Sequence, residues 1–205
     1  MAEFIKIFSN PIDQKAIDKV VAVLKRGGLV IYPTDTVYGL GCDIYNKKAL
    51  EKVARIKGVK LEKAELSFIC SDLKNLSDYT SQIETKTFKI LKRSLPGPYT
   101  FILPGGSNLP PAFKRKKTVG IRIPDSPIAL ALAKSLGNPI VSTSIKDEDE
   151  VIEYTTDPEL IFEKWQGQVD IVIDGGYGGN EGSTVVDLTT STPVLIREGK
   201  GEIIL

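Results

Sequence analysis

The sequence predicts an α/β protein built on an open, twisted mixed β-sheet with flanking helices. Two observations carry this prediction. Short apolar runs rich in β-branched residues alternate with amphipathic stretches through roughly the first two thirds of the chain, and strand-like runs dominate the end. No repeat, low-complexity linker or shift of composition divides the 205 residues, so we expect one domain over residues 1–205.

Capping residues set the boundaries of the predicted helices. Asn10 followed by Pro11 predicts the start of the first helix, which Gly27 ends as a left-handed cap. Asn46 caps a second helix that closes at Lys57 and Gly58. The other predicted helices run from Ile83 to Leu91, from Ser126-Pro127 to Gly137, and onward from Asp157-Pro158.

The predicted strands are short and apolar, and several of them end at a proline or a polar cluster. Residues 59–65 form a charged loop between two such elements, and 147–150 is an acidic run. Strands are predicted over 4–8, 29–32, 67–70, 99–103, 119–123, 139–141, 169–173, 183–188 and 194–197.

Composition excludes several function classes. The chain has no histidine, which removes Ser-His-Asp and Cys-His catalysis and histidine metal ligands. The net charge of +1 gives no global attraction to nucleic acid. The apolar runs are too short to span a membrane, no signal peptide is visible, and Cys42 and Cys70 lie in apolar contexts typical of reduced core thiols. We therefore expect a cytoplasmic protein without a membrane partner.

The stretch 27–43 is the centre of the sequence pattern. After the apolar run 29–32, Pro33 stops the strand, and Thr34, Asp35, Thr36 and Tyr38 come within a few residues of it. A loop rich in hydrogen-bonding groups at a strand end is where α/β sheets place ligands, although a polar turn that satisfies its own backbone fits equally well.

Several further polar groups follow or interrupt predicted strands. Arg122 alternates with two isoleucines, and we favour a cleft over a solvent face for it because Pro124 ends the strand. The segment 142–144 either caps the next segment of the chain or presents hydroxyls to an anion, and Lys57 either complements a helix dipole or contacts phosphate. The glycine-rich stretch 175–184 favours a flexible hairpin, and the basic run 114–117 favours a solvated loop over a phosphate patch. Polar loops at strand ends are expected to converge on one crevice.

In combination these motifs resemble the YrdC-type family, the threonylcarbamoyl-AMP synthases. The resemblance covers almost the whole chain, and the order and spacing of the motifs match the family. It rests on Pro33-Thr34-Asp35-Thr36-Val37-Tyr38-Gly39-Leu40-Gly41, Pro96-Gly97-Pro98-Tyr99-Thr100, Val119-Gly120-Ile121-Arg122-Ile123-Pro124, Ser142-Thr143-Ser144, Gly182-Ser183-Thr184-Val185-Val186-Asp187 and Ile196-Arg197-Glu198-Gly199.

Two departures make the sequence similar to the YciO branch of that family. The synthases carry a Lys-x-Arg motif after the second helix, and here Lys57 keeps the lysine while Val59 replaces the arginine. They also carry a Ser-x-Asn motif, and here Ser144 keeps the serine while Lys146 replaces the asparagine. Lysine does not reproduce the bidentate geometry of arginine, so these departures bear on phosphate binding.

The resemblance implies an activity and a set of roles. ATP, L-threonine and bicarbonate would give threonylcarbamoyl-AMP and pyrophosphate, with Mg²⁺ on the phosphates, for the N6-threonylcarbamoyl modification of adenosine 37 in tRNA. Lys57 is implied as the catalytic residue. The implied threonine site is Thr34, Thr36, Arg122, Ser142 and Ser183, and the implied ATP site is Lys57, Thr118, Ser144 and Arg197.

Two other interpretations remain open from the sequence. In the first, the chain is an RNA- or nucleotide-binding protein of the YciO type with weak or no synthase activity, and its partner is tRNA or double-stranded RNA. Alternatively, it is a hydrolase or transferase that acts on the threonylcarbamoyl group. The charged loop 59–65 is a candidate lid if the protein is a synthase.

Overall fold

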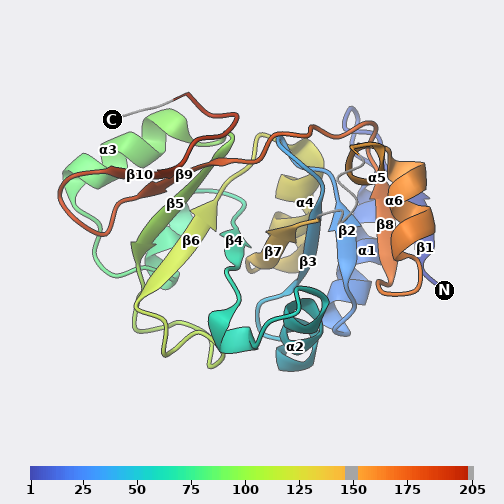
Figure 1. The fold of residues 1–205 in the computed structure, drawn as a ribbon, viewed down its shortest axis with the longest axis horizontal. Coiled ribbons are helices and arrows are strands. Elements are labelled where there is room, and N and C mark those ends of the chain that lie inside the picture. The colour runs from blue at the N-terminus through green and yellow to red at the C-terminus, as the bar shows by residue number, and fades with distance from the viewer. Residues whose placement is uncertain (146–151, 203–205) are drawn as a thin grey trace.

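The protein, seen in a computed structural model that describes residues 1–145 and 152–202, is organised around a ten-stranded mixed sheet. Figure 1 shows the sheet with helices on both of its faces, which confirms the predicted fold class. The strand order is β1-β8-β2-β3-β7-β4-β6-β5-β9-β10. The strands are β1 (Glu3–Lys6), β2 (Val30–Tyr32), β3 (Gly39–Asp43), β4 (Ser67–Ile69), β5 (Tyr99–Pro104), β6 (Thr118–Arg122), β7 (Ile140–Ser144), β8 (Ile171–Asp174), β9 (Thr184–Asp187) and β10 (Val194–Arg197).

The pairing of the strands makes the sheet mixed. β1 and β2 both run parallel to β8, β4 runs parallel to β6, and β5 runs parallel to β9. The remaining neighbours are antiparallel. Three strands, β3, β7 and β4, therefore separate β2 from β6 in the sheet.

Helices cover both faces of the sheet around β2, because this strand is apolar on both of its faces. Val30 and Tyr32 of β2 belong to the same buried cluster as the apolar residues of α1 and α4, and these two helices pack on each other. Leu29 and Ile31 point the other way, into the cluster that contains residues of α2, α3 and α6. The helices are α1 (Gln14–Lys25), α2 (Lys47–Ile56), α3 (Thr85–Ser94), α4 (Pro127–Leu136), α5 (Glu153–Thr156) and α6 (Pro158–Trp165), with 3₁₀ turns η1 (Leu61–Lys63) and η2 (Lys74–Asp78).

Most of the predicted helix boundaries are confirmed. Asn46 accepts a hydrogen bond from the N–H of Ala49, and Asp157 accepts one from Glu159 at the start of α6. Gly137 directly follows α4 and Gly27 follows the C-cap residue of α1, and both adopt a positive φ of 83°. The prediction that Asn10 starts the first helix is wrong, because Asp13 caps α1 by accepting from the N–H groups of Lys15 and Ala16.

Four other local predictions need correction. Residues 39–43 form a strand that the sequence analysis missed, and residues 59–65 contain the turn η1. Residues 142–144 belong to β7 and do not follow it. The stretch 175–184 does not form a hairpin, because it leads from β8 into β9 and these two strands are not neighbours in the sheet. The acidic run 147–150 lies outside the described residues.

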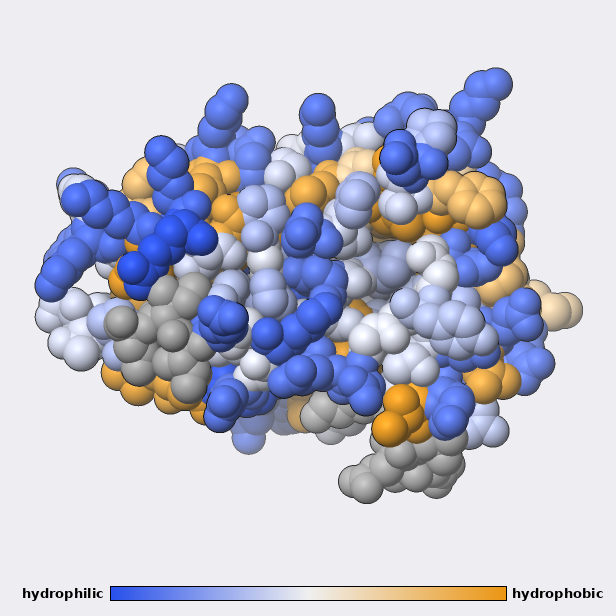
Figure 2. All heavy atoms as spheres, turned by 90° about the horizontal axis from the view of Figure 1, so that it is seen from above, coloured by the Kyte–Doolittle hydropathy of each residue, from blue (hydrophilic) through white to orange (hydrophobic). Residues whose placement is uncertain are grey.

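The exterior is mainly polar on the face that Figure 2 shows, where hydrophobic atoms form small, separate groups. Within residues 1–145 and 152–202, no helix combines the length and the apolar character needed to cross a membrane. Cys42 and Cys70 are buried free thiols, as predicted, and burial raises the pKa of each to about 12.

Candidate functional site

A polar cleft of about 620 Å³ lies on the sheet where β3, β7, β4, β6, β5, β9 and β10 follow one another. Seven of the nine predicted site residues line it, namely Lys57, Thr118, Arg122, Ser142, Ser144, Ser183 and Arg197. The other two, Thr34 and Thr36, are not among the lining residues. Thr36 Oγ1 accepts a hydrogen bond from Arg122, and Thr34 Oγ1 is hydrogen-bonded to Thr36 Oγ1. The predicted convergence is therefore found, but the faces of the strands contribute as much as the loops at their ends.

The alternation of side chains along β6 builds the floor of the cleft. Thr118, Gly120 and Arg122 face the cleft, whereas Val119 and Ile121 are buried in the core. Gly120 has no side chain, so the floor stays open between Thr118 and Arg122.

Arg122 is the buried cation of the site. Its Nη2 donates to Asp35 Oδ1 at 3.0 Å and to Thr36 Oγ1 at 2.9 Å. The Arg122 and Asp35 side chains are only 9% and 8% exposed. Burial lowers the pKa of Arg122, and the Asp35 carboxylate opposes this effect. The Nε of Arg122 is buried without a hydrogen-bond partner among the described residues.

The loop between β2 and β3 is ordered by its own polar groups. Thr34 Oγ1 donates to the Val37 carbonyl at 2.6 Å and accepts from the Thr36 N–H at 3.1 Å. Asp35 also accepts the N–H of Asp125 at 3.0 Å. The connection after β8 fixes this loop from outside, because the Gly179 N–H donates to the Thr36 carbonyl at 2.9 Å. This ordered loop therefore fixes the orientation of the Arg122 guanidinium through Asp35 and Thr36.

Hydroxyl groups on neighbouring strands complete the wall near Arg122. The Tyr32 hydroxyl donates to Ser142 Oγ at 2.8 Å, and burial raises the pKa of Tyr32, which keeps the phenol neutral. On the other side, Ser183 Oγ and Thr100 Oγ1 share a hydrogen bond of 2.7 Å. Arg197 Nη2 donates to the Ser183 carbonyl at 2.8 Å.

Lys57 follows α2 directly, as the sequence predicted, and reaches over the sheet. Its Nζ donates to Thr143 Oγ1 on β7 at 2.7 Å. With Arg122 and Arg197 it makes the cleft cationic, while Glu65 is the one carboxylate among the described residues that line it. Over residues 1–145 and 152–202, no group of three or more Cys, Asp or Glu side chains is placed to hold a metal ion.

Several residues of the site were not predicted from the sequence, among them two carboxylates, a hydroxyl and a lysine. Asp35 and Thr100 stood inside the family motifs but received no role, and Glu65 and Lys116 were assigned to loops. A signal existed for Asp35, because a carboxylate between two threonines in a polar loop is suited to orient a cation. Glu65 and Lys116 reach the cleft only through the folding of distant loops, which no local pattern reveals.

Comparison with known proteins then gives the family. A family model named Sua5_yciO_yrdC and described as "Telomere recombination" matches residues 22–199. The chain belongs to the Sua5/YciO/YrdC family. An uncharacterized protein YciO of Escherichia coli strain K12 is 40% identical over 206 residues, which are 99% of this chain and 98% of that protein. This confirms the predicted resemblance, including its YciO branch.

Solved structures of family members have the same architecture. The crystal structure of E. coli YciO superposes with a TM-score of 0.88 at 40% identity, covering 98% of each chain. The structure of P. abyssi Sua5 complexed with L-threonine has a TM-score of 0.84 at 29% identity and covers 97% of this chain and 58% of that one. A threonylcarbamoyl-AMP synthase of Bacillus subtilis is 33% identical over 186 residues, 89% of this chain and 53% of that protein.

Proposed function

We propose that this protein forms threonylcarbamoyl-AMP and pyrophosphate from L-threonine, bicarbonate and ATP. The observation that carries the proposal is Arg122, a guanidinium that lines the cleft and is held in place by Asp35 and Thr36. A fixed guanidinium of this kind suits a carboxylate ligand, such as that of an amino acid. Relatives named threonylcarbamoyl-AMP synthase and the L-threonine complex of Sua5 support threonine as that amino acid.

In this proposal the cleft divides between the two substrates. Arg122 pairs with the threonine carboxylate, and the hydroxyls of Ser142 and Ser183 bind its other polar groups. Thr34 and Thr36 act from behind by fixing the position of Arg122. Lys57, Thr118, Ser144 and Arg197, which also line the cleft, bind ATP.

The chemistry needs no nucleophile from the protein, which agrees with a chain without histidine. The threonine amine attacks carbon dioxide derived from bicarbonate and loses a proton, which gives a carbamate. A carbamate oxygen then attacks the α-phosphorus of ATP, the P–O bond to the β-phosphate breaks, and pyrophosphate leaves. The protein contributes positioning and neutralises charge, and Lys57 is the cation proposed to act at the reacting phosphates. Mg²⁺ enters as the MgATP complex, and tRNA is the proposed acceptor of the threonylcarbamoyl group.

The test is adenylate formation by the purified protein. ATP, Mg²⁺, bicarbonate and L-threonine are supplied, and both pyrophosphate release and product mass are followed. We expect pyrophosphate that requires threonine and bicarbonate, and a loss of about a hundredfold in Arg122→Met. Arg93→Met, at an exposed position in the last turn of α3, is the matched control. A folded protein that binds ATP but forms no adenylate would rule out the synthase.

A second candidate is an RNA- or nucleotide-binding protein with weak or no synthase activity. It is favoured by Val59, which lies outside the cleft lining and carries no charge. The other departure, Lys146, lies outside the described residues. This candidate predicts thermal stabilisation by structured RNA that falls steeply with salt, whereas the synthase predicts stabilisation by ATP with threonine.

A further inference from the structure

Lys116 extends the polar face of the cleft beyond the start of β6. It lines the cleft together with Thr118, Gly120 and Arg122. Lys116 and Arg122 are six residues apart, so their Cα atoms are separated by at most about 20 Å along the chain. The cleft thus has a cation toward each end of β6, and the glycine at position 120 leaves the space between them open.

The ammonium group of Lys116 is placed differently from its neighbours in the basic run 114–117. Lys114, Arg115 and Lys117 are exposed, but Lys116 is half-buried. Its Nζ donates to the Ala64 carbonyl at 2.5 Å, which uses one of its three donors. Burial lowers the pKa of Lys116, and the Glu65 carboxylate opposes this effect. The side chain is therefore held at one place and partly removed from water.

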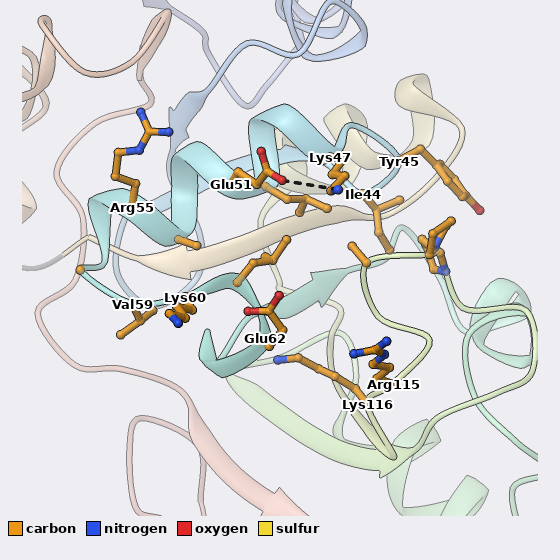
Figure 3. A pocket seen from close by; sticks show the side chains of 17 residues that line it. Ile44, Tyr45, Lys47, Glu51, Arg55, Val59, Lys60, Glu62, Arg115 and Lys116 are labelled. Atoms are coloured by element: carbon orange, nitrogen blue, oxygen red, sulfur yellow. Dashed lines mark ion pairs between the residues drawn. The ribbon is translucent and has the colours of Figure 1, made fainter.

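Lys116 also lines a second cavity, which adjoins the cleft. This groove of about 1290 Å³ lies between α2, η1 and the segment 110–116. Figure 3 shows Lys60, Glu62, Arg115 and Lys116 around the part of the groove near η1, with Arg55 and the Lys47–Glu51 ion pair along α2. Five of these side chains are cationic and two are anionic, so an anion that leaves the cleft past Lys116 meets further positive charge.

We propose that Lys116 binds the diphosphate end of the nucleotide and that pyrophosphate leaves the cleft through this groove. The proposal rests on the proposed function, because it assigns an orientation to ATP in the same site. Threonine is held at the Arg122 end, the α-phosphate lies between, and the β- and γ-phosphates point toward Lys116. A cation at this position neutralises the charge that develops on the leaving diphosphate.

The groove supports this orientation over the reverse one. Val59, two residues after Lys57, lies in the groove and carries no charge, so Lys116 is the cation that reaches the cleft from the groove side. Asp35 already balances the charge of Arg122, so this guanidinium suits the single charge of the threonine carboxylate better than the higher charge of a diphosphate.

The experiment measures the binding of inorganic pyrophosphate by calorimetry in the wild-type protein, Lys116→Met, Lys116→Arg and Lys114→Met. Methionine keeps an unbranched apolar stem, so the packing of the side chain is retained. Lys114→Met removes an exposed charge from the same run and is the matched control. We expect Lys116→Met to weaken pyrophosphate binding about tenfold, Lys116→Arg to restore most of it, and Lys114→Met to stay within about twofold. The KM for ATP should rise in Lys116→Met while the KM for threonine is unchanged.

The outcomes separate the two proposals. Equal pyrophosphate binding in the wild-type protein and Lys116→Met, with adenylate formation intact, overturns the role of Lys116 and leaves the synthase standing. Lys116-dependent pyrophosphate binding without adenylate formation supports the diphosphate site and overturns the synthase. A wild-type protein that binds neither pyrophosphate nor ATP overturns both. Thermal unfolding of each variant excludes misfolding as the cause of a loss.

Discussion

Replacing Asp35 by asparagine tests the buried ion pair that positions Arg122. The carboxylate accepts from Arg122 at 3.0 Å and from the N–H of Asp125 at 3.0 Å, and both charged side chains are less than a tenth exposed. Removing one partner of a buried pair costs about 3–5 kcal/mol, because the other charge stays buried without compensation. In Asp35→Asn, Arg122 keeps Thr36 Oγ1 and the new amide oxygen can still accept a bond. We therefore expect the lower end, about 3 kcal/mol.

The assay is urea unfolding, with the midpoint and the m-value both fitted. A loss of about 3 kcal/mol lowers the melting temperature of a chain of this length by about 6–12 °C. The matched control is Glu51→Gln, which removes one partner of the exposed Lys47–Glu51 pair (3.7 Å, side chains 77% and 49% exposed). The control should change the free energy of unfolding by less than about 0.5 kcal/mol.

A double variant tests whether Asp35 and Arg122 are energetically coupled. If the cost arises from an uncompensated buried charge, Asp35→Asn combined with Arg122→Met should cost less than the sum of the two single changes. An Asp35→Asn loss no larger than that of Glu51→Gln, or strict additivity in the double variant, would show that the pair does not stabilise the site as described.

Two further predictions concern the loop that holds Arg122 and the two buried thiols of the core. Gly179→Ala places a Cβ 2.4 Å from the Thr36 carbonyl oxygen, so it should lower the free energy of unfolding by about 1–3 kcal/mol and weaken threonine binding, while Gly167→Ala, with no atom within 4 Å, should be neutral in the same urea titration. A neutral Gly179→Ala would mean that this contact does not hold the loop. Cys42 and Cys70, with pKa values raised to about 12 by burial, stay protonated at pH 8, so an aromatic disulfide reagent should label them only in urea. Rapid labelling of the native protein would contradict this burial.

The sequence predicted much of the fold because the signals for its elements are local. Asn46, Gly137 and Asp157 mark helix ends through contacts within four residues, and the structure confirms all three. The first helix start was misplaced because Asn10 and Asp13 are both good caps, and only the fold around them selects Asp13. The strand at 39–43 was missed because two of its five residues are glycine, which is depleted in strands.

The site could be predicted only in part, because its residues are brought together by contacts that are not local in the chain. The resemblance to a family named seven residues that the structure places in the cleft, but their partners come from other parts of the chain. Asp35 and Arg122 are 87 positions apart, and Ser183 and Thr100 are 83 apart. No pattern within a window of the sequence specifies such pairs, because they depend on how the strands are ordered in the sheet.

That strand order also bears on how the protein folds. The loop after β2 contacts Arg122 of β6 across three intervening strands, and one of these, β7, comes later in the chain than β6 itself. Closing such non-local contacts costs entropy that only the finished sheet repays, so they form late in folding. The guanidinium is thus oriented only once the chain has been synthesised beyond β7 and the sheet has been assembled.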